Sequence, residues 1–311
     1  MDTKKDLISI ADFSRDEIGK LVVKTAQLKK NKLLEFSSLQ GQTLAIILQK
    51  PSTRTCVSFA AGMVQLGGNP LILNPQDLQI KRGETFQDTA KILSRFVDAI
   101  MIRANRHSDV LELAEHASIP IISGLTEKEH PCQALSDIFT IYEKKKLSAL
   151  EDFKKISIAY LGDGNNVAHS LMLAAALLGM KITVASPKNY EPEKEYVQQS
   201  LDIAKKTGAM ISITNDPVAA VKSVDVMYTD VWASMGKDEE RESRKQIFKS
   251  YQINEILLKS AGSDPLIMHC LPAHRGEEIT AEVLDGASSI VLDQAENRLH
   301  MQKAILLYLL K

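Results

Sequence analysis

An apolar run, Thr43-Leu44-Ala45-Ile46-Ile47-Leu48, leads into the stretch Pro51-Ser52-Thr53-Arg54-Thr55, after which a helix-like segment continues to Gly67-Gly68. The run predicts a buried strand, and a proline followed by hydroxyl residues predicts the start of a helix. The first turn of a helix has unbonded backbone N–H groups and the positive end of the helix dipole. Hydroxyls and an arginine there make an anion site, with phosphate as the expected anion. The five residues alone are equally typical of an ordinary Ser52 N-cap with Arg54 facing solvent.

Strand-like and helix-like patterns alternate along the rest of the chain, in two similar blocks. Strand-like segments of the first block lie at 44–48, 70–73, 98–102 and 119–122. Those of the second block lie at 156–161, 181–185, 210–214, 225–228, 266–269 and 289–292. Helix-like segments, among them 246–260, separate the strands, so the sequence predicts an α/β protein of two domains, each a parallel sheet flanked by helices. The polar stretch between Lys144 and Asp152 is the expected boundary.

Length and composition limit the class of protein. The chain has 311 residues, of which 44% are hydrophobic and 25% charged, with a net charge of −1 and three cysteines. A chain of this length usually forms two domains, and its charge offers no footprint for nucleic acid. No apolar stretch is long enough to span a membrane, and the first residues lack the apolar core of a signal peptide. Three cysteines do not make a disulfide framework, so the expected location is the reducing cytoplasm.

Polar residues follow the ends of strand-like segments in both blocks. In open parallel sheets, ligands bind beyond the carboxyl ends of the strands. The positions concerned are Ser52–Thr55, Arg103, Gly162–Asn166, Asp230–Trp232 and His269–Pro272. This coincidence predicts one site that takes residues from both blocks.

The motif Gly162-Asp163-Gly164-Asn165-Asn166-Val167 invites a dinucleotide-binding interpretation but fits it only in part. Val167 stands where such a turn has its third glycine, and no acidic residue follows the next strand-like segment, 181–185. Glycine is needed here for a tight turn, which leaves Asn166 to face a ligand at a helix start. A nicotinamide-dependent oxidoreductase is therefore disfavoured.

Histidine, cysteine and aspartate stand in three further motifs. His130-Pro131-Cys132-Gln133 opens a helix and offers two side chains that suit a carbonyl and an amide. His269-Cys270-Leu271-Pro272 places a thiol at the end of a strand, and Asp230 suits either an ammonium group or a helix N-cap. The alternatives are a structural histidine, an inert buried cysteine and a zinc site. No pair has the usual zinc-ligand spacing, so we expect no metal.

Taken together, these motifs resemble those of the aspartate/ornithine carbamoyltransferase family, and most closely its ornithine branch. The residues that carry the resemblance occur in family order over nearly the whole chain: Ser52–Thr55, Arg103, His130–Gln133, Gly162–Asn166, Asp230–Gly236, His269–Pro272 and Ala295–Arg298. The Ser234-Met235-Gly236 turn and the His-Cys-Leu-Pro motif are specific to the ornithine branch. The resemblance implies a carbamoyl-phosphate-binding domain at 1–147, an ornithine-binding domain at 148–293, and a C-terminal helix, 294–311, that packs back on the first domain.

The resemblance also implies a reaction and the residues that perform it. The carbamoyl group of carbamoyl phosphate would pass to the δ-amine of L-ornithine, giving L-citrulline and phosphate in arginine metabolism, in a homotrimer and without a cofactor. The implied carbamoyl-phosphate site comprises Ser52, Thr53, Arg54, Thr55, Gln79 (reaching a neighbouring subunit's carbamoyl phosphate), Arg103, His130, Gln133, Cys270, Leu271 and Arg298. The implied ornithine site comprises Asn166, Asp230, Ser234 and Met235, and the implied catalytic residues are Cys270, Arg103, His130 and Arg54. A carbamoyltransferase for putrescine or another amine is the nearest alternative; putrescine is disfavoured because it has no α-carboxylate for the Ser234-Met235 turn.

The chain departs from the family pattern at two places. Cys56 stands where the family usually has arginine, and Ile80-Lys81 replace the bacterial Leu-Gly after Gln79. The first change leaves the local packing and charge open, and the second leaves the loop geometry open. Biosynthetic and catabolic members share all these residues, so the direction of the reaction and any stacking of trimers also stay open, as does adventitious metal binding at cysteine.

Overall fold

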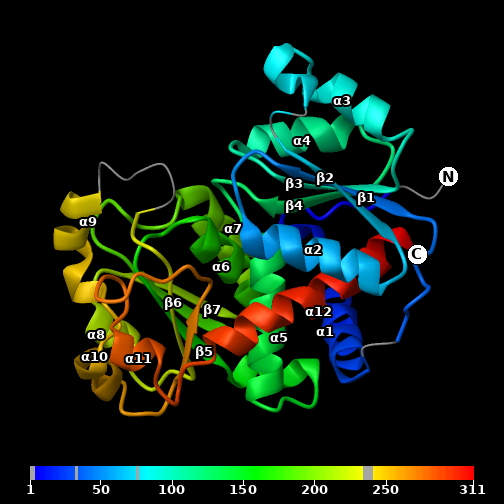
Figure 1. Cartoon of the computed structure of the whole chain (residues 1–311). Coiled ribbons are helices and arrows are strands. Elements are labelled where there is room, and N and C mark those ends of the chain that lie inside the picture. Colours follow the sequence, from blue (N-terminus) through cyan, green and yellow to red (C-terminus); the bar gives the residue numbers. More distant parts are fainter. Residues whose placement is uncertain (1–3, 32–33, 75, 77, 234–240) are drawn as a thin grey trace. The chain divides into compact units, whose positions relative to one another are not determined.

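The protein folds into two α/β units, seen in a computed structural model that describes residues 4–31, 34–74, 76, 78–233 and 241–311. One unit comprises Met1–Glu143 with Glu296–Lys311, and the other comprises Lys144–Ala295. Each unit has its own parallel sheet with helices on both faces (Figure 1). The fold class predicted from the alternating patterns is therefore confirmed. None of the described helices combines the length and apolar character needed to cross a membrane.

The sheet of the first unit has four strands in the order β2-β1-β3-β4. The strands are β1 (Thr43–Leu48), β2 (Asn69–Leu73), β3 (Ala99–Arg103) and β4 (Ile121–Leu125). The helices are η1 (Ile10–Asp12), α1 (Arg15–Lys30), α2 (Thr53–Gln65), η2 (Gln79–Arg82), α3 (Phe86–Leu93), α4 (His107–His116), α5 (Pro131–Lys144) and α12 (Val291–Leu310). Helices α3 and α4 cover one face of this sheet and α2, α5 and α12 lie on the other (Figure 1). Because both faces are covered, β1 and β3 are almost continuously apolar and buried.

The strand order of the first unit defines where its ligand site should lie. The chain runs from β1 outward to β2, then returns to β3 on the other side of β1. Such a reversal is a topological switch point, and ligands bind at its carboxyl edge. The register places Arg103 beside Leu48, at the edge from which the chain continues to Ser52. The opening stretch and Arg103 therefore meet at the switch point of this sheet.

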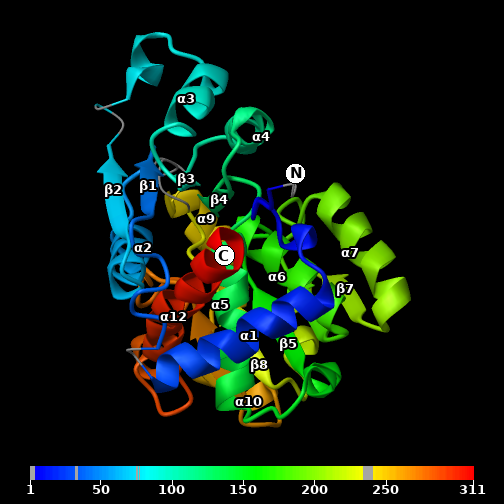
Figure 2. The same ribbon diagram turned by 90° about the vertical axis from the view of Figure 1, so that its right-hand side faces the viewer.

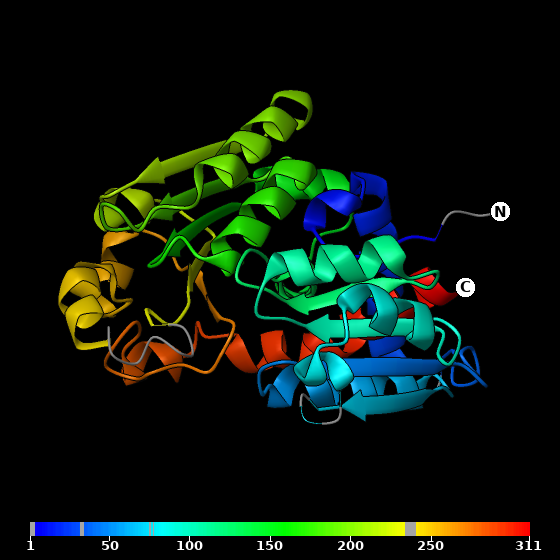
Figure 3. The same ribbon diagram turned by 90° about the horizontal axis from the view of Figure 1, so that it is seen from above.

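The sheet of the second unit has five parallel strands in the order β7-β6-β5-β8-β9. The strands are β5 (Ser157–Leu161), β6 (Lys181–Ala185), β7 (Met210–Thr214), β8 (Val226–Thr229) and β9 (Leu266–His269). The helices are η3 (Leu150–Lys155), α6 (Asn166–Leu178), α7 (Lys194–Thr207), α8 (Pro217–Ala220), α9 (Arg241–Phe248), η5 (Lys249–Tyr251), α10 (Glu255–Ser260) and α11 (Ala281–Leu284). Figure 3 shows α6 and α7 together along one face of this sheet. Its switch point lies between β5 and β8, where Leu161 pairs with Thr229, which in turn pairs with His269.

Two predicted elements of the second unit were wrong. Residues 289–292 are not a strand: Ser289 forms an isolated bridge with Ile267, and the last helix already begins at Val291. Residues 246–260 are not one helix, because Ile253 is extended and pairs with Ile279, and Asn254 caps a new helix, α10. In both cases a short tertiary pairing overrides the local periodicity.

From Glu296 onward, α12 belongs to the first unit, as the predicted packing of the C-terminal helix requires. Helices α1, α5 and α12 lie side by side (Figures 1 and 2). Asn297 of α12 joins the other two, accepting a hydrogen bond from Lys29 Nζ at 2.8 Å and donating one to Thr140 Oγ1 at 3.0 Å. Lys303 Nζ donates to Gln65 Oε1 of α2 at 3.2 Å.

Candidate functional site

The Ser52 side chain at the start of α2 is not an ordinary helix cap. Ser52 occupies the N-cap position, but its hydroxyl makes no capping hydrogen bond. It accepts a hydrogen bond from Arg103 Nη1 at 3.1 Å instead. Arg103 is buried at the end of β3, so a guanidinium lies at the positive end of the helix dipole. This arrangement favours the anion-site interpretation over the N-cap.

A second buried guanidinium, that of Arg298 in α12, ties two predicted ligands together. Its Nη2 donates to Thr55 Oγ1 at 2.8 Å and its Nη1 donates to Gln133 Oε1 at 2.7 Å. Gln133 Nε2 in turn donates to Asp137 Oδ1 at 2.8 Å. The arginine thus orients Thr55 on α2 and Gln133 on α5, and one lone pair of Gln133 Oε1 remains for a further donor.

His130, just before α5, is a buried neutral imidazole. Burial lowers its pKa well below the ordinary value, and the positive charges of Arg298, Arg103 and Arg54 lower it further. The imidazole therefore carries no charge at neutral pH and offers one N–H group as a donor. The three guanidiniums make its surroundings electropositive, which suits an anion. We call Ser52, Thr55, Arg103, His130, Gln133 and Arg298, together with the exposed Thr53 and Arg54, the cationic cluster.

The lowered pKa of His130 predicts that acid destabilises the protein. In the unfolded chain the His130 side chain has a pKa of about 6.5 and is protonated below that pH, whereas in the folded protein it stays neutral. Unfolding therefore takes up a proton below about pH 6.5. The free energy of unfolding should therefore rise with pH between about 5 and about 7, by at most about 1.4 kcal/mol per pH unit for this group. Urea unfolding at several pH values checks this, and His130→Gln should make the dependence shallower. It should not abolish it, because burial also lowers the pKa of His300. An unchanged slope in the variant would contradict the assignment.

The second unit holds a group of opposite character at its switch point. Asp230 is buried directly after β8. Its Oδ1 accepts two hydrogen bonds, one from the Cys270 thiol at 2.9 Å and one from the Val231 N–H at 2.8 Å. Asn165 Nδ2 donates to the other oxygen, Oδ2, at 2.8 Å. Asn166 begins α6 one residue later. We call Asp230, Cys270, Asn165 and Asn166 the acidic cluster.

The structure brings most, but not all, of the predicted residues into these two clusters. Gln79 is exposed at the start of η2, where its Oε1 accepts from Arg82 at 3.4 Å. Ser234 and Met235 lie outside the described residues. Asn165 is a residue that sequence reasoning missed. Its position as an N-cap, directly before the helix-like segment, was the available signal.

Metal-type donors occur near the acidic cluster, but other bonds already engage them. Among the described residues, the two groups with suitable spacing are Asp230, His269 and Cys270, and His274, Glu277 and Glu278. His269 uses both ring nitrogens: Nε2 lies 3.0 Å from Glu278 Oε1, and Nδ1 accepts the Leu271 N–H at 2.8 Å. Glu277 pairs with Arg241. His269 therefore fixes the backbone of Leu271, whose φ of 57° lies in the left-handed region.

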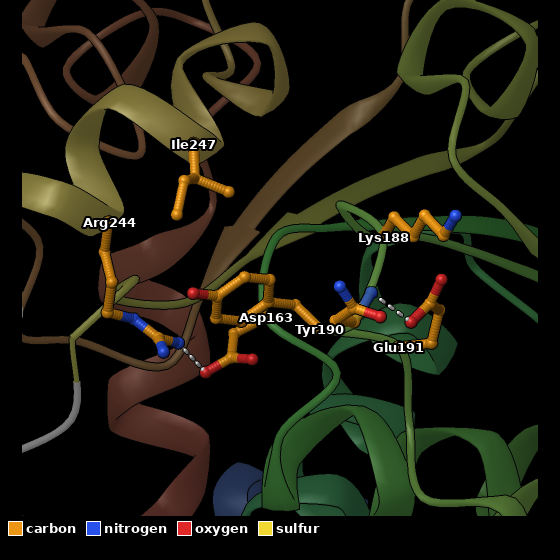
Figure 4. Close-up of a pocket in the computed structure, with 7 residues that line it drawn as sticks. Asp163, Lys188, Tyr190, Glu191, Arg244 and Ile247 are labelled. Atoms are coloured by element: carbon orange, nitrogen blue, oxygen red, sulfur yellow. Dashed lines mark hydrogen bonds and ion pairs between the residues drawn. The ribbon is translucent and has the colours of Figure 1, made fainter.

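A cavity of about 680 Å³ lies beside the Gly162–Asn166 motif in the second unit. Its lining residues are Asp163, Lys188, Asn189, Tyr190, Glu191, Arg244 and Ile247. Figure 4 shows Arg244 reaching from α9 to the Asp163 carboxylate. The guanidinium lies 4.8 Å from the centre of the Tyr190 ring and also donates to the Trp232 carbonyl. Arg244 thus ties the loop after β5 to the loop after β8.

Comparisons with known proteins agree on one family. The model of the aspartate/ornithine carbamoyltransferase carbamoyl-P binding domain matches residues 5–143, and that of the Asp/Orn binding domain matches residues 154–309. Ornithine carbamoyltransferase from Anoxybacillus flavithermus is 53% identical over 309 residues, which are 98% of this chain and 96% of the relative. The anabolic ornithine carbamoyltransferase of Pyrococcus furiosus is 50% identical over 310 residues, covering 97% of this chain and 95% of the relative.

Solved structures give the same result. The ornithine carbamoyltransferase structure from Pyrococcus furiosus superposes with a TM-score of 0.93 at 49% identity, covering 98% of this chain and 96% of the other. Anabolic ornithine carbamoyltransferase from Campylobacter jejuni superposes with a TM-score of 0.90 at 39% identity, covering 98% of each chain.

Proposed function

Because the chain belongs to the aspartate/ornithine carbamoyltransferase family, we propose that it transfers the carbamoyl group of carbamoyl phosphate to the δ-amine of L-ornithine. The products are L-citrulline and phosphate. The observation that carries the proposal is the opposite character of the two clusters: guanidiniums surround His130 in the first unit, whereas Asp230 marks the switch point of the second. Carbamoyl phosphate is an anion, and ornithine carries ammonium groups. Aspartate, whose second carboxylate gives it a net negative charge, suits the surroundings of Asp230 poorly.

The cationic cluster is the proposed carbamoyl-phosphate site. The backbone N–H groups and hydroxyls of Ser52–Thr55, with Arg54, hold the phosphate oxygens. Thr55, Arg103 and neutral His130 direct donors at the carbonyl oxygen, where negative charge develops as the amine attacks. One such donor is typically worth about 3 kcal/mol in the transition state. A neutral histidine suits this task because it donates a hydrogen bond to the carbonyl oxygen but adds no positive charge that would hold back the leaving phosphate.

The carbamoyl amide needs acceptors, and the proposed ones are Gln133 Oε1 and the Leu271 carbonyl. Arg298 orients Gln133 through the 2.7 Å hydrogen bond, and His269 orients Leu271 through the 2.8 Å bond to its N–H. Each proposed acceptor is thus oriented within its own unit, which lowers the entropy cost of ordering it when substrate binds.

The acidic cluster is the proposed ornithine site. Asp230 binds the α-ammonium group, and Asn166 with Ser234 and Met235 binds the α-carboxylate. Cys270 lies beside the δ-amine, which must be neutral to attack. A primary amine has a pKa of about 10.4, so the reactive form costs about 4 kcal/mol near pH 7.4. The new C–N bond forms as the C–O bond to phosphate breaks, and phosphate leaves with the electron pair. Cys270 helps to position the δ-amine or, in its thiolate form, takes up the amine proton.

We propose a homotrimer in the cytoplasm as the working form, with residues 1–147 and 294–311 binding carbamoyl phosphate and residues 148–293 binding ornithine. The exposure of Gln79 is what a contribution to a neighbouring subunit's site requires. Cysteines that form no disulfide suit a reducing compartment, and this holds for all three described cysteines. The proposed direction is biosynthetic, since two of the relatives are described as anabolic.

A colorimetric assay for carbamoylated product tests the proposed reaction directly. Purified protein is given carbamoyl phosphate with L-ornithine, putrescine or L-aspartate in turn. We expect citrulline from ornithine, and a kcat/KM for ornithine at least about a hundredfold above that for the other two amines, because putrescine lacks the α-carboxylate and aspartate lacks the δ-amine. Preference for putrescine would overturn the assigned roles of Asp230 and Asn166. Absence of product with all three amines would overturn the function.

A further inference from the structure

The Asn165 side chain makes four hydrogen bonds within and beside the acidic cluster. Its Oδ1 accepts three hydrogen bonds, from the Tyr160 hydroxyl at 3.0 Å and from the N–H groups of Val167 and Ala168 at 3.0 and 3.3 Å. Its Nδ2 donates to Asp230 Oδ2 at 2.8 Å. Because three donors converge on Oδ1, the amide can adopt only one orientation, with Nδ2 directed at the carboxylate.

The Asp230 carboxylate is therefore held on both oxygens. Asn165 engages Oδ2, while Val231 and Cys270 engage Oδ1. A side chain held in this way keeps one rotamer and one direction toward its ligand, so the entropy cost of ordering it is met before the ligand arrives.

Tyr160 stabilises the orientation of the Asn165 amide. Its ring is fully buried in β5 and packs against the Tyr228 ring at 5.7 Å. Burial raises the pKa of its hydroxyl well above the ordinary value, and the negative charges of Asp230 and Asp163 raise it further. The phenol therefore stays protonated and acts as a permanent donor to Asn165 Oδ1.

We propose that Asn165 is a positioning residue for the α-ammonium group of the amino-acid substrate, acting through Asp230, and that Tyr160 fixes its orientation. The inference rests on the proposed function, which assigns Asp230 to the ammonium. Asn165 touches no reacting atom in this scheme. Its effect is confined to the strength with which Asp230 holds the substrate.

The test separates positioning from helix capping. Asn165→Ser keeps a capping oxygen for α6, since serine caps as well as asparagine, but removes the donor to Asp230. Asn254→Ser is the matched control, because Asn254 caps α10 through the Leu257 N–H at 3.0 Å in the same unit. The probe is L-norvaline, which has the α-ammonium and α-carboxylate of ornithine but no δ-amine. Its Kd is measured by titration calorimetry in the presence of carbamoyl phosphate.

We expect Asn165→Ser to raise the norvaline Kd and the KM for ornithine about tenfold or more, the loss typical of a hydrogen bond to a charged group. The KM for carbamoyl phosphate should stay within about twofold, and Asn254→Ser should change neither constant. Tyr160→Phe should weaken norvaline binding by a smaller factor, because the two backbone donors to Asn165 remain.

An unchanged norvaline Kd in a folded Asn165→Ser variant would overturn the proposal. Equal weakening toward both substrates would also overturn it, since that is the signature of general structural damage. Failure of the proposed function is recognised separately: wild-type protein would then yield no citrulline, whatever the variants bind.

Discussion

Arg54→Gly should lower kcat/KM with respect to carbamoyl phosphate by about a thousandfold, leaving turnover close to background. Arg54 is exposed on the second residue of α2, so removing its side chain opens no cavity. Its planar guanidinium matches phosphate oxygens through paired, charge-assisted hydrogen bonds, which are stronger than neutral ones. Steady-state citrulline formation with carbamoyl phosphate varied is the measurement.

Glycine itself is a poor helix former, with a cost of about 1 kcal/mol, so the Arg54 variant needs a matched control. Arg15→Gly places the same substitution at the start of α1 in the same unit. It should cost similar stability and retain activity. A variant at Arg54 that keeps more than about a tenth of wild-type activity would refute the phosphate assignment.

Asp230→Asn should raise the KM for ornithine at least about a hundredfold while leaving the KM for carbamoyl phosphate nearly unchanged. The substitution keeps the shape of a buried side chain and removes its charge. Losing one partner of a buried charge pair typically costs about 2–5 kcal/mol of binding. Initial rates with each substrate varied at saturation of the other separate the two constants.

Asp225→Asn is the control for loss of a carboxylate beside the same strand, since Asp225 directly precedes β8. Asp225 accepts from Ser157 N–H at 2.9 Å and pairs with Lys145, so its role is structural. It should lower the melting temperature without changing the KM for ornithine. Equal KM effects of the two substitutions would show that Asp230 acts through stability instead of substrate binding.

Sequence patterns predicted the fold class and the two sheet edges because both follow from local rules. Buried parallel strands are continuously apolar, so their ends are readable wherever polar residues begin, as at Ser52, Arg103 and Asp230. The competing N-cap interpretation of Ser52 could not be excluded at that level, since a serine before a helix is typical of both. In the structure the Ser52 hydroxyl makes no capping bond and accepts from Arg103 on another strand, which argues against the N-cap and leaves the anion site as the proposal.

The features that sequence could not supply depend on contacts between distant residues. The prediction of a strand at 289–292 is wrong because Ser289 forms only a single bridge, to Ile267, and α12 begins at Val291. The local hydrophobic pattern does not show that the pairing stops after one residue. In the sequence, the turn at Gly162–Asn166 assigns a ligand-facing position to Asn166 and no role to Asn165. Its hydrogen bonds to Tyr160 and Asp230 become visible only once β5 and β8 pair.

Arg298 has a consequence for how the protein is made. Thr55, whose hydroxyl it orients, precedes it by 243 positions, so the ribosome has translated most of the message before this arginine exists. During synthesis the first unit therefore stays incomplete, because α2 and α5 lack the guanidinium that bonds to both of them until α12 has been synthesised. A stop codon upstream of Arg298 would thus remove the guanidinium that orients Thr55, near the end of the chain that is made first. The proposed phosphate site at Ser52 is therefore among the earliest segments translated and one of the last parts of the protein to be completed.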